Sequence, residues 1–112
     1  MLQQPTQQTN IAQAIKFDTD KVPMHLLSNE ALKQTAAVLD FGQNKYAAHN
    51  WRKGFLWSRV LGAAMRHLHA FNDGEDKDPE SGLSHLAHAS CCLMFLLEFE
   101  LTHPELDDRY KE

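Results

Sequence analysis

The chain has 112 residues, of which 43% are hydrophobic, so it is long enough for one domain core and too short for two ordinary domains. A formal charge of −4 and the lack of any Lys- or Arg-rich run exclude a protein that holds a nucleic-acid polymer by neutralising many phosphates. A single nucleotide is not excluded, because one or two cations and a divalent metal ion can hold it whatever the net charge.

Residues 1–27 are predicted to form a flexible N-terminal segment with at most one short helix. Residues 1–10 are rich in Gln and Thr and lack the basic and apolar regions of a signal peptide. The pattern over residues 11–22 is weak, and Pro23 ends it. We therefore expect no signal peptide here.

The first sustained helical pattern begins at Ser28, a good N-terminal capping residue. Glu30 stands in the first turn, where a carboxylate favours the exposed N–H groups. Apolar and small residues then recur at helical spacing up to Gly42, which favours a helix end. The sequence therefore predicts a helix over residues 28–42, followed by an ordered loop over residues 43–54.

Two more helices are predicted in the second half of the chain. Apolar residues at three- and four-residue steps favour a helix over residues 56–72, which Asp73 and Gly74 end. The next helix starts near Leu83 and runs to about residue 102, where Pro104 stops it. Its second half is apolar nearly all round, so we expect this helix to be the central, most buried element.

Together these patterns predict an all-α protein: a small bundle of three main helices, with one domain over residues 28–103 and a charged C-terminal tail over residues 104–112. A helical chain this short often completes its core by pairing with a copy of itself, so we expect a homo-oligomer. Cys91 and Cys92 are neighbours in an apolar run and are interpreted as reduced core residues, typical of a cytoplasmic protein. That run, residues 91–97, is far shorter than the roughly 20 residues of a membrane span, so no membrane partner is expected.

The loop between the second and third helices is dense in carboxylates, among them Glu75, Asp78 and Glu80. Like charges so close repel unless a cation or a solvated spread of side chains relieves them. A hard divalent ion such as Mg²⁺ or Mn²⁺ prefers carboxylate oxygens and keeps waters that it shares with a substrate phosphate. Taken alone, a solvated acidic turn is the better explanation of this loop.

Three histidines strengthen the case for function. His85 and His88 are three residues apart, hence on one helical face directly after the acidic loop. His67 lies beside the apolar stripe of the preceding helix, and a short connection favours antiparallel helices, which brings all three imidazoles toward the loop. Arg66 adds a guanidinium suited to a bidentate phosphate contact. We therefore predict one functional cluster here.

The loop before the second helix mixes cations, an amide and aromatic rings. Trp51 is suited to stack on a purine base, and Asn50 to hydrogen-bond the edge of that base. Lys45, Arg52 or Lys53 would steer phosphates. The alternative is that Trp51 is a core residue and the lysines are solvated, and for this loop taken alone that is the better explanation.

Several short blocks stand in a fixed order along the chain: Lys45-Tyr46, Asn50-Trp51-Arg52-Lys53-Gly54, Arg66-His67, Gly74-Glu75, Asp78, Glu80-Ser81-Gly82 and His85-Leu86-Ala87-His88-Ala89. In this order they closely resemble the phage-encoded dATP/dGTP diphosphohydrolase family, over residues 29–99. The resemblance implies a relative of the all-α, MazG-like nucleoside triphosphate pyrophosphatases. These are metal-dependent helical oligomers that cleave nucleoside triphosphates to the monophosphate and pyrophosphate. A phage would use such an enzyme in the host cytoplasm to reshape its purine deoxynucleotide pool.

The resemblance and the residues together suggest roles. The expected ligands of one or more Mg²⁺ (or Mn²⁺) ions are Glu75, Asp78 and His85. The ion would screen the phosphate charge and lower the pKa of a bound water. Glu80, His67 or His88 would orient or deprotonate that water. Arg66 and Lys53 would stabilise charge on the phosphate oxygens, and the substrate, a purine (deoxy)nucleotide, would also meet the loop of Lys45, Asn50 and Trp51.

One departure from the broader pattern leaves an alternative open. MazG-like enzymes carry a Glu-x-x-Glu pair on one helix and Glu-x-x-Asp on the next, whereas the corresponding helices here carry Arg66-His67 and His85-x-x-His88. Fewer carboxylate ligands with a basic and aromatic pocket would also suit a non-catalytic, sponge-like protein that binds a nucleotide or nucleotide signal. A purely structural helical module is the third interpretation.

Overall fold

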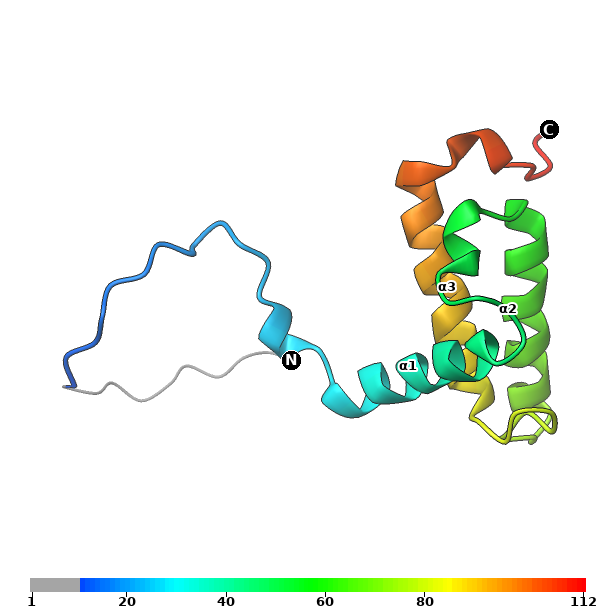
Figure 1. The fold of residues 1–112 in the computed structure, drawn as a ribbon, viewed down its shortest axis with the longest axis horizontal. Coiled ribbons are helices and arrows are strands. Elements are labelled where there is room, and N and C mark those ends of the chain that lie inside the picture. Colours follow the sequence, from blue (N-terminus) through cyan, green and yellow to red (C-terminus); the bar gives the residue numbers. More distant parts are fainter. Residues whose placement is uncertain (1–10) are drawn as a thin grey trace.

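Figure 1 shows a computed structural model of the protein, which describes residues 11–112. The described residues form helices α1 (Asn29–Gln43), α2 (Trp57–Asn72) and α3 (His85–Thr102), and short 3₁₀ turns at Met24–Leu26, Asn50–Lys53 and Pro104–Leu106. Within this part of the chain there is no strand beyond one isolated bridge between Lys77 and Ser84. The all-α prediction with three main helices is confirmed. Residues 1–10 of the predicted flexible segment lie outside the described residues.

Helices α1 and α2 lie within one residue of their predicted ends. The Ser28 side chain caps α1 by accepting the backbone N–H of Ala31. Helix α1 extends to Gln43, one residue further than predicted. Asp73 follows the last residue of α2, and Gly74 then adopts φ +99°, a left-handed conformation that favours glycine at a helix end.

The predicted start of α3 at Leu83 is wrong by two residues. Helix α3 begins at His85, because the Ser84 side chain accepts the backbone N–H of Leu86 and so caps the first turn. Leu83 instead belongs to the loop, where its carbonyl accepts the backbone N–H of Asp78. The later start places His85 in the first turn of the helix, directly under the loop.

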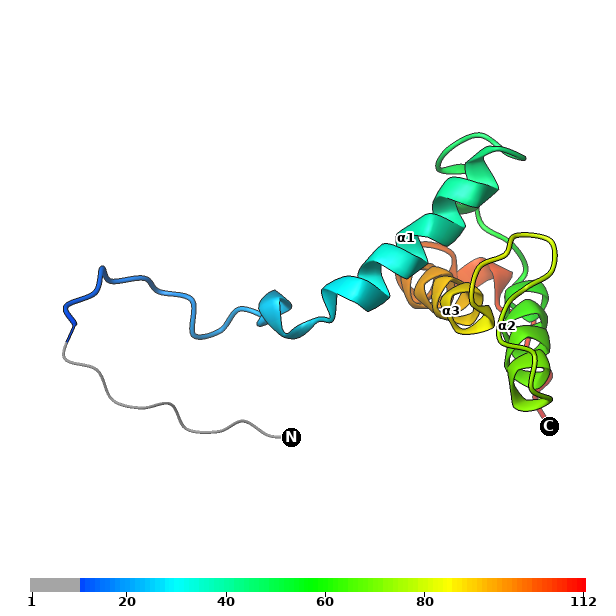
Figure 2. The ribbon, with the colours of Figure 1, turned by 90° about the horizontal axis from the view of Figure 1, so that it is seen from below.

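Helices α2 and α3 run antiparallel and side by side, and α1 crosses them on the side of α3 (Figures 1 and 2). Helix α3 packs against both other helices, as expected of the central element. The loop over residues 73–84 joins α2 and α3 at the end where α1 crosses. This arrangement brings the end of α2, the start of α3 and the connecting loop together.

Two apolar clusters hold the helices. Val38 of α1 packs with Ala87 and Cys91 of α3. Further along α3, Phe99 packs with Trp57 and Val60 of α2, and a larger set of partly buried residues surrounds them: Trp51, Phe55, Cys92, Phe95, Leu96 and Leu106. Because Phe99 is fully buried, it fixes how α2 and α3 pack and therefore how their far ends meet.

Replacing Phe99 by alanine should lower the free energy of unfolding by about 3–5 kcal/mol, the usual cost of removing a fully buried aromatic ring. The matched control is Leu101→Ala on the same helix, because Leu101 is 85% exposed and its loss should cost less than about 0.5 kcal/mol. Urea unfolding followed by circular dichroism measures both. Equal losses from the two variants would contradict the core as described.

Part of the predicted charged tail packs against the start of α2. The Trp57 indole donates a hydrogen bond to the carbonyl of His103, and the backbone N–H and hydroxyl of Ser58 both bond the Asp108 carboxylate. The Arg109 guanidinium lies over the Trp57 ring. Leu106 joins the cluster around Phe99, because an apolar side chain between charged neighbours gains by burial. These contacts cover the end of the bundle that is far from His67, His85 and His88 (Figure 1).

Several apolar side chains on α2 and α3 remain exposed to solvent. They are Leu61, Met65, Leu68, Phe71, Leu86, Leu93, Leu97 and Leu101. The apolar stripes predicted from the sequence include most of them, and a single copy of the chain buries only the Trp57, Val60 and Ala64 part of the α2 stripe. The homo-oligomer stays a prediction, which these side chains make easy to test. No helix within residues 11–112 is long and apolar enough to cross a bilayer.

If a second copy covers these side chains, Leu97→Glu will disrupt the assembly, because Leu97 is 67% exposed and a carboxylate buried without a partner is unfavourable. The expected result is a particle mass that falls by about half or more in light scattering after size exclusion. Thr102→Glu, an exposed position on the same helix, is the control and should leave the mass unchanged. A native protein that already runs at the mass of one chain would contradict the prediction.

Candidate functional site

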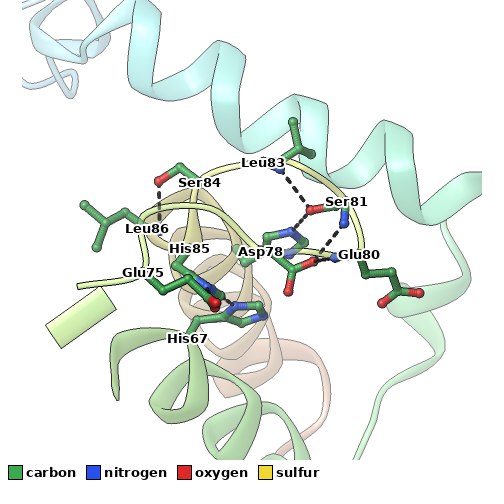
Figure 3. A network of polar contacts seen from close by, with 10 residues as sticks. His67, Glu75, Asp78, Glu80, Ser81, Leu83, Ser84, His85 and Leu86 are labelled. Atoms are coloured by element: carbon green, nitrogen blue, oxygen red, sulfur yellow. Dashed lines mark hydrogen bonds and ion pairs between the residues drawn. The ribbon is translucent and has the colours of Figure 1, made fainter. Parts of the chain in front are cut away.

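The end of α2 and the start of α3 bring three imidazoles into one cluster. His67 Nδ1 of α2 lies 2.8 Å from His85 Nδ1 of α3. The His67 ring also stacks on the His88 ring, with centroids 4.5 Å apart and planes inclined by 9°. Figure 3 shows His67 and His85 facing each other beneath the loop. The predicted meeting of these histidines, which required antiparallel helices, is what the structure shows.

Each of the three loop carboxylates has surroundings of its own. Glu75 Oε1 lies 2.7 Å from His85 Nε2, the ring nitrogen that does not contact His67. Glu80 instead pairs with Lys45 of the preceding loop, at 2.9 Å. Asp78 lies with the imidazoles: one ligand atom each from His67, Asp78 and His85 can be chosen so that all lie within 4.8 Å of one another. The repulsion expected among these carboxylates is therefore relieved by separate partners.

The loop holds its shape through Asp78 and Ser81. The Asp78 carboxylate accepts the backbone N–H groups of Glu80 and Ser81, a turn that aspartate commonly forms. The Ser81 hydroxyl accepts the backbone N–H of Leu83 and lies 2.7 Å from His88 Nε2. Ser81 is thus a site residue that sequence reasoning missed as a functional group. Its place three residues after an aspartate in a turn-forming loop was the available signal.

The surroundings favour neutral imidazoles and an ionised aspartate. The pKa of His67 lies below the ordinary value, because partial burial disfavours the charged ring and because the His88 and His85 rings are close. Burial likewise lowers the pKa of His88. Partial burial acts to raise the pKa of Asp78, but the hydrogen bonds from Ser81 and the nearby imidazoles outweigh it, and the net pKa is lowered. Neutral imidazoles can bind a metal or accept a proton.

A cavity of about 1100 Å³ lies beside this cluster, between α1, the loop before α2, and α3. The predicted site residues that line it are Lys45, Asn50, Trp51, Arg66, His67, Asp78, Glu80 and His88. Three others do not line it. Lys53 is exposed at the end of its 3₁₀ turn, whereas Glu75 and the buried His85 are joined to the cavity through His67.

Trp51 has two roles in the structure. Its ring stacks on Phe95, with centroids 4.5 Å apart and planes inclined by 12°, and the Arg52 guanidinium lies 4.5 Å from the ring centroid. Trp51 therefore supports the core as well as lining the cavity, and a purine would have to displace a neighbour to stack on it. Tyr46 lines the same cavity and is 59% exposed, so it offers an aromatic face that sequence reasoning did not single out.

The two cysteines also line the cavity, without the features of a nucleophile. Both are free thiols. Burial raises the pKa of Cys91 to about 12 and also raises the pKa of Cys92, so both side chains are protonated at neutral pH. Cys91 belongs to the apolar cluster with Val38, as expected of a core residue.

Comparison with known proteins gives two matches in sequence. The sequence model of a family described as "dATP/dGTP diphosphohydrolase, N-terminal" matches residues 12–109. A "dATP/dGTP diphosphohydrolase" of Salmonella phage PMBT28 is 39% identical over 95 residues, which cover 85% of this chain and 32% of the relative. This chain therefore spans about a third of that relative's length. No solved structure matches it.

Proposed function

Since the chain belongs to the dATP/dGTP diphosphohydrolase family, we propose that it is a metal-dependent enzyme that hydrolyses purine (deoxy)nucleoside triphosphates to the monophosphate and pyrophosphate. The observation that carries this proposal is the cavity that Lys45 and Arg66 share with His67, Asp78 and His88. Cationic side chains that can bind a polyphosphate and side chains that can act in hydrolysis line the same cavity, which is large enough for a nucleotide.

The cations of the cavity are available to a triphosphate. Lys45 pairs with Glu80, but both side chains are largely exposed, and such a pair contributes only about 0–1 kcal/mol. A phosphate can therefore replace Glu80 as the partner of Lys45. Arg66 forms no salt bridge with any residue from 11 to 112. Its guanidinium is free for a bidentate phosphate contact.

The base of the nucleotide would lie against the loop before α2. Tyr46 presents an exposed ring and Asn50 an amide, both on the cavity wall. Stacking on the ring and hydrogen bonds from the amide would select a purine over a smaller base, because the larger ring system buries more area. Trp51 supports this wall through its contact with Phe95.

The donor set of His67, Asp78 and His85 fits a divalent ion, because three ligand atoms lie within 4.8 Å of one another and the surroundings favour a neutral His67 and an ionised Asp78. A bound ion would supply charge screening for the phosphates and a water of lowered pKa. We assign the general base to His88, because it lines the cavity and because His67 belongs to the proposed ligand set. Ser81 orients the His88 ring, and Arg66 would stabilise charge on the phosphate oxygens.

Incubation with dATP or dGTP and a divalent ion tests the proposal, with products separated by ion-exchange chromatography. The expected products are the deoxynucleoside monophosphate and pyrophosphate in equal amounts. His88→Gln should lower kcat by about 10²- to 10⁴-fold, the usual contribution of a general base. His69→Gln is the matched control, because His69 is exposed on α2 and does not line the cavity; its activity should be unchanged.

Two other outcomes would overturn the enzyme proposal in favour of a named alternative. Tight binding of dATP or dGTP that stays intact would identify a non-catalytic nucleotide-binding protein. Neither binding nor turnover would leave a structural helical module.

A further inference from the structure

We propose that His67, His85 and Asp78 form a transition-metal centre, which takes an ion of the Mn²⁺ to Zn²⁺ series in preference to Mg²⁺, with Glu75 as the carboxylate that orients His85. The inference deepens the proposed function and rests on it for the role of the ion, although the ligand set stands on contacts of its own.

The spacing of the two imidazole nitrogens is that of neighbouring ligands of one ion. Two nitrogens bound at about 2.1 Å lie about 3 Å apart when their bonds are at right angles and about 3.4 Å apart at the tetrahedral angle. His67 Nδ1 and His85 Nδ1 are 2.8 Å apart. A hydrogen bond at this distance requires that one of these nitrogens carries the hydrogen and that the other accepts it. For an ion to bind both Nδ1 atoms, that hydrogen would move to Nε2 of the same ring, so that each neutral ring binds through a free Nδ1 lone pair.

Glu75 has the place of an outer carboxylate. Its Oε1 lies 2.7 Å from His85 Nε2, so this nitrogen donates its hydrogen to the carboxylate and Nδ1 is left to face His67. A metal-bound histidine almost always donates its other N–H in this way, and the contact fixes both tautomer and ring orientation. His85 is only 3% exposed, so its buried ring depends on these two contacts. The geometry thus gives Glu75 an orienting role and His67 a ligand role. The sequence had led us to expect Glu75 as a metal ligand and His67 as a residue that acts on the water.

The chemistry of the donors selects the class of ion. Mg²⁺ binds carboxylates, phosphates and water, demands near-ideal octahedral geometry, and gives up its waters reluctantly. Imidazole nitrogen suits Zn²⁺, Fe²⁺, Ni²⁺ and Cu²⁺, and two imidazoles with one carboxylate form a ligand set typical of transition metals with open positions. A site that offers two nitrogens and one carboxylate therefore favours the transition series.

The open positions of the ion would face the substrate. His67 and Asp78 both line the cavity, together with Lys45 and Arg66. His85 and Glu75 do not line it, and His85 contacts the cavity-lining His67. Water on an ion held by these residues would therefore be able to reach the space where the proposed function places the phosphates.

Cobalt is the probe for this centre, because its visible absorption reports on its ligands. Protein without a histidine tag, freed of metal by a chelator, should take up one Co²⁺ per chain with a new visible band. Zn²⁺ should abolish the band at equal concentration, whereas about a hundredfold excess of Mg²⁺ should leave it. His67→Ala and Asp78→Asn should each remove or strongly weaken binding. Glu75→Gln should weaken it by about 10- to 100-fold, as expected of an outer-shell partner.

His69→Ala is the control for the added loss of a histidine on α2 and should bind Co²⁺ as the native protein does. Circular dichroism of each variant confirms that the helices remain, so a loss of binding cannot be ascribed to unfolding. Failure to bind Co²⁺, binding that His67→Ala leaves unchanged, or displacement by Mg²⁺ would each overturn the inference. Hydrolysis that needs only Mg²⁺ would then leave the proposed function intact. Conversely, Co²⁺ binding through these residues without hydrolysis under any ion would overturn the proposed function alone.

Discussion

The contact between His67 and His85 is the interaction on which the site depends. It joins the end of α2 to the start of α3 at 2.8 Å, and it exists because the two helices are antiparallel and share one short loop. Phe99, Trp57 and Val60 fix the packing of the pair at the other end. Burial of apolar side chains at one end of the helix pair therefore positions the polar side chains of the site at the other end. This is possible because the two helices are rigid.

Burial of a histidine explains the form of the loop. His85 is almost fully buried, and a buried polar ring is costly unless its nitrogens are hydrogen-bonded. Glu75 and His67 satisfy them, while Asp78 and Ser81 hold the rest of the loop in the turn that permits this. The same contacts that stabilise the loop thus leave the neutral His67 ring and the ionised Asp78 beside a cavity that is also lined by Lys45 and Arg66. The hydrogen bonds required by the burial of His85 therefore both stabilise the loop and position the candidate site.

Local sequence patterns predicted the helices better than they predicted which side chains contact each other. Helical spacing and capping residues such as Ser28 located the helices, and the antiparallel hairpin followed from a short connection, so the gathering of His67, His85 and His88 was predictable. The roles of the individual residues were not predictable, because they depend on contacts between side chains of different helices and loops. Glu80 turns to Lys45, distant in sequence, and Trp51 turns to Phe95. Spacing within one segment contains no information about either contact.

We have proposed that His67, His85 and Asp78 hold an ion next to a bound nucleotide. The most direct measurement is a crystal structure of the protein grown with Mn²⁺ and a non-hydrolysable dATP or dGTP analogue, with anomalous scattering recorded to locate the metal. We expect an anomalous peak between the two facing imidazoles and the aspartate, with the phosphates of the analogue directed toward Lys45 and Arg66. An analogue bound elsewhere, with the two imidazoles still in direct contact and no metal between them, would contradict it.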